Sequence, residues 1–201
     1  MIDIYVINLK KRIDRLEQIK NDFNNYNLNI IEAEEDEIEG WKGCFKSHLK
    51  CISLAKEKQL NYIIVIEDDC KKTVNFDIDL IKILNWLENN MDKWNIFIGG
   101  VTNVWNYNSL IEINDNLDLI EIKTGKTFHF VIYNSNSFDF FLNQEINIPI
   151  DKSWHNKLIC FVSIPFIAIQ YEGFSDIENK LISYNSRYNI VEKYFICMLK
   201  K

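Results

Sequence analysis

The clearest hydrophobic pattern in the chain is a short apolar run that ends in acids. Residues 62–66 (YIIVI) are apolar or β-branched without alternation, which is typical of a strand buried on both faces near the centre of a parallel sheet. Glu67, Asp68 and Asp69 follow directly. We therefore expect a central strand over residues 62–67 that ends in three adjacent carboxylates.

Three adjacent carboxylates raise one another's pKa, because like charges close together oppose ionisation. A cation usually compensates for such crowding, and a hard divalent ion suits the carboxyl end of a strand. The alternative is an acidic turn that caps the next helix. The residues alone leave both interpretations open.

The first half of the chain alternates between two hydrophobic periods. Strand patterns cover residues 2–9, 28–33, 62–67 and 94–100, and helical patterns cover residues 10–25, 41–58 and 77–90. This order predicts an α/β fold with a largely parallel, doubly wound sheet, whose ligands bind at the carboxyl ends of the strands.

The second half is less regular. We expect strands over 117–122 and 127–133 joined by a turn at Gly125, a helix over 134–143 capped by Ser135 or Ser137, a strand or loop over 148–151, and a helix over 189–200. The length suits one domain over residues 1–201, with halves of about 1–100 and 101–201.

Composition and charge argue against some classes of function. The net charge of −6 and the lack of a basic stripe argue against nucleic acid as a partner, and no apolar run approaches the ~20 residues of a membrane span. The five cysteines show no CxxC spacing, which favours reduced thiols and a soluble, cytoplasmic protein. The richness in Ile, Asn and Lys suggests an AT-rich genome. If that genome is viral, we expect the host cytoplasm or the virion.

Two further features lie at strand ends. Four basic residues, among them Arg12 and Arg15, crowd the first strand-to-helix turn, where cations oppose the helix dipole. This favours a diphosphate or nucleotide facing them, although solvated basic residues are the alternative. The glycine pair 99–100 permits close approach of another group or forms a turn.

Six short motifs then occur in a fixed order. They are residues 6–15 (VINLKKRIDR), 43–49 (GCFKSHL), 63–69 (IIVIEDD), 94–99 (WNIFIG), 149–151 (PID), and Gln170 with 175–177 (SDI). Together they resemble glycosyltransferase family 25, which includes bacterial lipooligosaccharide and animal procollagen galactosyltransferases. Two departures, Trp41 for Glu and Asn95 for Asp, bear on specificity more than on the reaction.

The resemblance implies a GT-A-type fold, in which a Rossmann-like nucleotide-binding sheet is continuous with an acceptor-binding half. It also implies a UDP-sugar donor, most often UDP-galactose, with Mn²⁺ or Mg²⁺ as cofactor. Transfer would proceed with inversion to a hydroxyl of a glycan or a hydroxylysine-type acceptor.

The resemblance also suggests roles for individual residues. Asp69 and then Glu67 are the expected metal ligands, because alternate residues of a strand point to one side. Contacts to the nucleotide-sugar are expected from Asn8, Arg12, Arg15, Gly43, Ser47, Asp68 and Gly99.

Inversion needs a general base at the acceptor hydroxyl, for which Asp151 is the first candidate and Asp176 the second. His129 and His155 are either a third metal ligand or structural residues. The aromatic residues Trp154, Tyr171 and Phe174 either stack on a sugar or belong to the core.

Two other classes of function remain open. A metal-dependent phosphohydrolase or phosphotransferase would need a second acidic cluster, for which Asp77 and Asp79 are the only weak candidates. A non-catalytic module that binds a nucleotide-sugar or a glycan is the other, although such a module has no need of three crowded acids.

Overall fold

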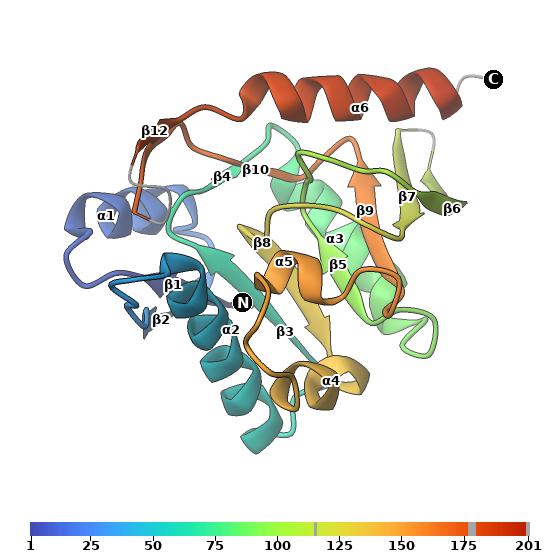
Figure 1. Ribbon diagram of the computed structural model, residues 1–201. Coiled ribbons are helices and arrows are strands. Elements are labelled where there is room, and N and C mark those ends of the chain that lie inside the picture. The colour runs from blue at the N-terminus through green and yellow to red at the C-terminus, as the bar shows by residue number, and fades with distance from the viewer. Residues whose placement is uncertain (115, 177–179, 200–201) are drawn as a thin grey trace.

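One mixed sheet forms the centre of the protein (Figure 1). The computed structural model describes residues 1–114, 116–176 and 180–199. In these residues eight strands pair in the order β2-β1-β3-β8-β5-β9-β7-β6. Their bounds are β1 Asp3–Asn8, β2 Asn27–Glu32, β3 Tyr62–Glu67, β5 Ile96–Ile98, β6 Tyr107–Asn114, β7 Leu117–Ile122, β8 Phe130–Asn134 and β9 Cys160–Ile164.

The expected α/β, GT-A-type architecture is confirmed, because one sheet continues from the first half of the chain into the second. The four strands predicted in the first half, β1, β2, β3 and β5, run in one direction, as expected, but two strands of the second half run the opposite way. β8 inserts antiparallel between β3 and β5, and β7 pairs antiparallel with β6 and β9. The strands expected on either side of Gly125 therefore do not pair with each other. All five residues of β8 are buried, so the sheet centre accommodates them better than an edge does.

The helices cover both faces of the sheet (Figure 1). They are α1 Ile13–Asp22, α2 Gly40–Glu57, α3 Phe76–Glu88, α4 Phe138–Leu142, α5 Ile150–Ser153 and α6 Asn185–Leu199, with a 3-10 turn over Ser135–Ser137. In β3, Ile63 and Val65 join the core that contains the buried side chains of α2. Ile64 and Ile66 join the opposite core, under α1 and α3. This two-sided burial explains why β3 lacks alternation.

Several local predictions in the second half are right only in part. Of the strand or loop expected over residues 148–151, residues 148–149 are a loop, but Ile150 and Asp151 begin α5, a helix too short to show a hydrophobic period. Ser137 occupies the N-cap position of α4, as expected, but makes no capping hydrogen bond. The preceding 3-10 turn is capped by Asn134, whose side chain accepts from the Asn136 amide. The last helix begins at Asn185, before residue 189, and residue 200 lies outside the described part.

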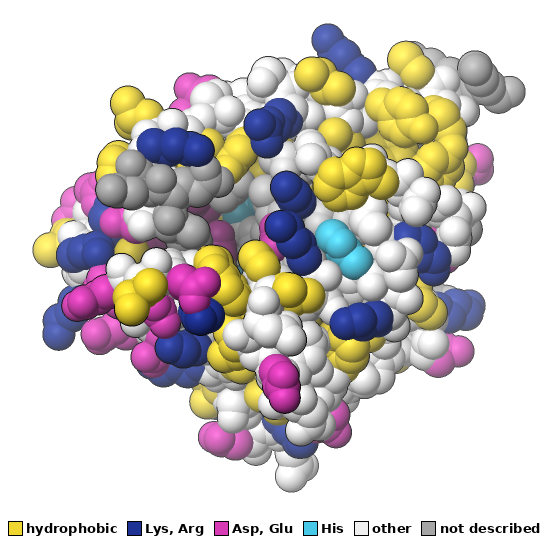
Figure 2. Space-filling view, viewed as in Figure 1, with side chains coloured by type: hydrophobic (Ala, Val, Ile, Leu, Met, Phe, Trp, Pro, Cys, Tyr) yellow, Lys and Arg dark blue, Asp and Glu magenta, His cyan; other side chains and the backbone are white. Residues whose placement is uncertain are grey.

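Two small sheets escaped the sequence patterns. β4 (Cys70–Lys72) pairs antiparallel with β10 (Ala168–Gln170), and β11 (Gly173–Ser175) pairs with β12 (Lys180–Ile182). The β4–β10 pair brings the second half of the chain directly beside the acidic end of β3. Acidic side chains also gather where the loop before α2 meets the β1–β2 edge (Figure 2). Within the described residues, no helix has the length and apolar character to cross a bilayer.

Candidate active site

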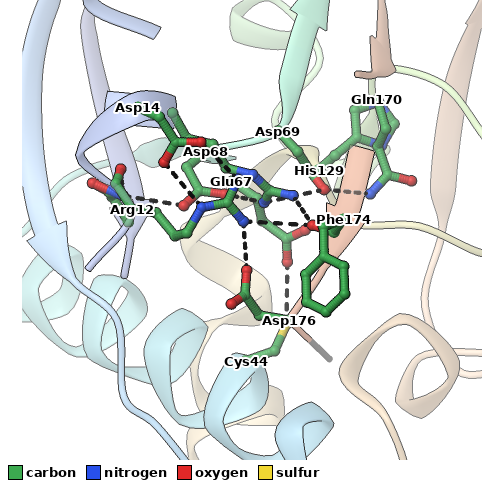
Figure 3. Close-up of polar contacts among 12 residues, drawn as sticks. Arg12, Asp14, Cys44, Glu67, Asp68, Asp69, His129, Gln170, Phe174 and Asp176 are labelled. Carbon is green, nitrogen blue, oxygen red and sulfur yellow. Dashed lines mark hydrogen bonds and ion pairs between the residues drawn. The ribbon is translucent and has the colours of Figure 1, made fainter. Parts of the chain in front are cut away.

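The three carboxylates at the end of β3 lie at the carboxyl edge of the parallel strands β1, β2 and β3. Each acid has its own set of partners, drawn from different parts of the chain (Figure 3). The three are therefore chemically distinct groups, although they are neighbours in sequence.

Glu67 is held by two residues of α2. Its Oε1 accepts a hydrogen bond from the Cys44 thiol at 3.1 Å and lies 3.3 Å from Nε2 of His48. The other ring nitrogen of His48 lies 2.9 Å from the Tyr133 hydroxyl. Burial alone would raise the pKa of Glu67, but the contacts with His48 and Cys44 outweigh it and lower that pKa. Glu67 is therefore an ionised carboxylate in a fixed orientation.

Asp68 faces the first strand and helix. It accepts from Nδ2 of Asn8 at 3.1 Å and from Nη1 of Arg15 at 2.6 Å. Burial raises the pKa of Asp68 even though Arg15 opposes the shift. Asn8 is itself buried and also donates to the Leu9 and Arg12 carbonyls. Asn8 and Arg15, both expected at the nucleotide, thus position an acid in this structure.

Asp69 is the least satisfied of the three acids. Its Oδ2 accepts from Nε2 of Gln170 at 3.1 Å and lies 3.9 Å from Nη1 of Arg15. Its Oδ1 is buried and has no hydrogen-bond partner among the described residues. Burial, and then the charge of Glu67, raise the pKa of Asp69 to about 7. A buried, unpartnered carboxylate oxygen next to an ionised one fits a divalent cation, whose preferred ligands are such oxygens.

Two cavities meet at these acids. The first has a volume of about 380 Å³ and the second about 310 Å³, within the range of small-molecule sites. Five residues line both cavities: Arg15, Cys44, Glu67, Asp69 and Ser175. Any two ligands in these cavities would therefore approach each other at Glu67 and Asp69.

The first cavity lies over the ends of β1 and β3. The acidic loop 34–37 lines it, together with Lys11, Asp68 and Asp176. Arg12 does not line this cavity itself, but its Nη1 donates to Asp176 at 2.6 Å. The neighbouring Ile177 of the last motif lies outside the described residues.

The second cavity contains the other candidate base. Asp151, in the first turn of α5, lines it, and its Oδ2 accepts from the Thr127 amide at 3.2 Å. Burial raises the pKa of Asp151. Asp151 and Asp176 therefore lie in different cavities, with the acids of β3 between them.

Three of the predicted nucleotide contacts also have structural roles, and one of them, Ser47, lines the first cavity. A Cβ on Gly43 would lie 2.4 Å from the Glu34 carbonyl oxygen, so glycine allows α2 to approach the acidic loop. The Ser47 hydroxyl accepts from the Glu34 amide and donates to the Gly43 carbonyl, both at 2.8 Å. A Cβ on Gly99 would lie 2.9 Å from atoms of Phe130, and Gly99 does not line either cavity.

The two candidate histidines also lie outside the cavity linings. His129 is fully buried, and burial lowers its pKa to about 4. Its Nδ1 lies 3.3 Å from the Tyr188 hydroxyl, and its Nε2 has no partner among the described residues. Nε2 of His155 lies 2.7 Å from the Gly125 carbonyl oxygen. His155 thus holds the Gly125 loop.

The candidate stacking residues divide into core and surface. Trp154 is fully buried in the core. Tyr171 lines the second cavity, and its hydroxyl donates to Asp22. The ring of Phe174 is exposed, whereas its carbonyl accepts from both Arg12 and Arg15. Only Tyr171 lies where a sugar in the second cavity would contact it.

Sequence reasoning missed the link between Cys44, His48 and Glu67. Their ligand atoms lie within 4.8 Å of one another, a group that could also hold a metal ion. The signal was present, because residues four apart in a helix share a face and Cys44 and His48 have this spacing. The sequence could not show that Glu67 is their partner, because Glu67 lies on β3, a separate element.

The acids considered for a second metal cluster are occupied elsewhere. Asp77 accepts from Tyr26 and Lys72, and Asp79 accepts from Lys82. Both residues lie in the first turn of α3, and these partners occupy their carboxylates. They give no support to a two-metal phosphohydrolase.

The sheet thus carries two cavities that share a cluster of carboxylates. The model of glycosyltransferase family 25, described as an LPS biosynthesis protein, matches residues 36–147. The chain belongs to this family and is a glycosyltransferase by family. No curated protein sequence matches it.

Solved structures give remote likenesses. "A197 from STIV" shares 10% identity and a TM-score of 0.48, covering 90% of this chain and 93% of that one. A "glycosyltransferase involved in the glycosylation of the major capsid of PBCV-1" shares 14% identity and a TM-score of 0.45, covering 70% and 62%. HddC from Yersinia pseudotuberculosis shares 12% identity and a TM-score of 0.41, covering 80% and 68%. At these scores they carry no argument about function.

Proposed function

We propose that this protein transfers a sugar, with galactose the first candidate, from a UDP-sugar to a hydroxyl group of a glycan or protein acceptor. The single observation that carries the proposal is the junction of the two cavities at Glu67 and Asp69. A transferase must bring a donor and an acceptor together at one point, and this junction provides that point.

The donor is assigned to the first cavity. Open strand ends are the usual place for nucleotides in α/β sheets. The loop 34–37 offers carboxylates that can accept hydrogen bonds from ribose hydroxyls or the uracil N–H. Arg15 lies where both cavities meet and supplies a positive charge for the diphosphate. Its pairing with Asp68 keeps the guanidinium in place.

A divalent cation, Mn²⁺ or Mg²⁺, is assigned to Asp69, with Glu67 beside it. The unpartnered Oδ1 of Asp69 and its raised pKa support this assignment. When bound, such an ion neutralises the charge that develops on the departing diphosphate. Glu67 keeps the local field negative, because Cys44 and His48 hold it ionised.

Asp151 is assigned as the general base of an inverting transfer. It lies in the second cavity, away from the acidic loop that would hold the nucleotide. A raised pKa brings a carboxylate closer to the range where it accepts a proton efficiently near neutral pH. Asp176 is less suited to this role, because Arg12 engages it at 2.6 Å.

The five free cysteines support a reducing compartment such as the cytoplasm as the place of action. The test of the function is a donor panel. The protein is incubated with Mn²⁺ and individual UDP-sugars, with and without saccharide acceptors, and released UDP is measured. One donor should give UDP release that requires the metal. No release from any donor, together with no metal-dependent thermal shift by UDP, would overturn the proposal.

A further inference from the structure

The lining of the second cavity includes three basic side chains from separate parts of the chain that do not line the first cavity. Lys126 precedes β8, Lys152 lies in α5 and Arg187 lies in the first turns of α6. Figure 2 shows Lys and Arg side chains gathered in the centre of this face, between α6 and α5.

Within the described part of the chain, these cations have no carboxylate partner. Across residues 1–114, 116–176 and 180–199, no Asp or Glu oxygen lies within 4.0 Å of Lys126, Lys152 or Arg187. Lys152 is near enough to Asp151 to oppose the rise of its pKa, but forms no ion pair with it. The guanidinium of Arg187 lies over the Tyr184 ring at 5.5 Å.

This arrangement is unusual for this chain. The net charge is −6, and the other two arginines, Arg12 and Arg15, are both held by carboxylates. Like charges that converge on one cavity repel each other unless an anion lies between them. A guanidinium fork matches the two oxygens of a carboxylate or phosphate, and stacking on an aromatic ring fixes its orientation.

The same cavity offers surfaces for the neutral part of a saccharide. Trp41, Tyr171 and Tyr184 line it, and aromatic rings in a pocket present flat apolar faces beside a few polar groups. Gly173 also lines it, and nothing lies within 4 Å of the position that a Cβ would take there. The cavity therefore combines ring faces, open space and positive charge.

We propose that the second cavity selects an acceptor saccharide that carries an anionic group, a carboxylate or a phosphate, which Lys126, Lys152 and Arg187 bind. The assignment of this ligand as the acceptor rests on the proposed function. The anion could also be the diphosphate of the donor. The acceptor is favoured because the three cations line only the second cavity, whereas Arg15 already serves the junction.

The test measures binding without transfer, so it stays separate from the test of the proposed function. Glucose, glucuronate and glucose 6-phosphate are titrated into the wild-type protein and followed by NMR chemical shifts. We expect at least one charged sugar to bind about 10-fold more tightly than glucose, and this preference to weaken as salt is raised from low to physiological concentration.

The variants are Arg187→Gln and the double variant Lys126→Gln/Lys152→Gln. Each should remove most of the preference for the charged sugar. Lys193→Gln is the matched control, because Lys193 is an exposed base on the same helix as Arg187 and does not line the cavity. Thermal melts show whether each variant folds, and the exposed positions of Lys152 and Arg187 make these changes compatible with folding.

Two results would overturn the inference. If the charged sugars bind no better than glucose, or do not bind at all, the second cavity contains no anion site. A loss of UDP affinity in the same variants, with no change for the charged sugars, assigns the cations to the donor diphosphate. If the protein binds charged sugars but transfers no sugar, that result counts against the proposed function only. The binding measurements decide the anion site independently.

Discussion

Nη1 of Arg15 lies 2.6 Å from Oδ1 of Asp68, which joins the first helix to the acidic end of β3. The same guanidinium donates to the Phe174 carbonyl at 2.6 Å and so connects β11 to this point. Both side chains are largely buried. Arg15 lines both cavities and Asp68 lines the first, so this pair fixes part of the cavity lining in addition to any contact it makes with a ligand.

The first prediction concerns this ion pair. Arg15→Gln should lower the free energy of unfolding by about 2–4 kcal/mol, because it leaves Asp68 charged and buried without its partner. Adding Asp68→Asn should recover a large part of that loss, and urea unfolding of the four proteins measures the coupling. Lys56→Gln, which breaks an exposed ion pair with Asp139, should cost about 0.5 kcal/mol or less. Equal losses in Arg15→Gln and Lys56→Gln would contradict the structural role.

The second prediction concerns Asp69. Asp69→Asn should abolish the stabilisation of the protein by UDP that depends on Mn²⁺, because the amide cannot replace an ionised ligand. Thermal shift with UDP, Mn²⁺, both or neither measures this. Asp92→Asn serves as the control, since Asp92 is an exposed acid that lines neither cavity. If Asp69→Asn keeps the metal-dependent shift, another residue holds the cation.

The third prediction separates binding from chemistry at Asp151. Asp151→Asn should keep UDP affinity unchanged while transfer falls by about 10²–10⁴-fold, the usual contribution of a general base. Calorimetric titration of UDP and product formation with the active donor give the two values. Asp176→Asn is the comparison, because Asp176 lines only the first cavity. Loss of UDP binding in Asp151→Asn would make Asp151 a structural or metal-binding residue instead.

The fourth prediction uses the buried His129, whose folded-state pKa is lowered to about 4. Its unfolded-state pKa is near 6.5, so between pH 6.5 and 4 the unfolded state binds the proton and the folded state does not. Stability is therefore lost as the pH falls through this window, by at most about 3 kcal/mol.

The measurement for His129 is urea unfolding at pH 7 and pH 4.5. The loss between these pH values should be smaller in His129→Gln than in the wild type, although the variant is less stable at pH 7. His155→Gln is a useful comparison, because His155 is only partly buried and contacts the Gly125 backbone. An unchanged pH dependence in His129→Gln would show that His129 is not the group responsible.

The local patterns predicted the first half of the chain well. β3 and α2 lie within one residue of the expected ranges, because each is long enough to show its period and has a buried face. Shorter elements escaped this reasoning. β4, β10, β11 and β12 have three residues each, so they show no period that could distinguish them from loops.

The candidate site, like the fold, could be predicted from the sequence only in part. The sequence by itself determined that a buried strand ends in three carboxylates and that a basic turn follows the first strand, since both are properties of neighbouring residues. Only the tertiary structure decided that Arg15 pairs with Asp68, 53 positions away, and Gln170 with Asp69, 101 positions away. Hydrophobic periods report which face of an element is buried, but not which element covers it. The parallel pairing of β1 with β3 brings the start of α1 beside Asp68, and the pairing of β4 with β10 brings Gln170 beside Asp69. Long-range pairing of this kind depends on the packing of the whole sheet.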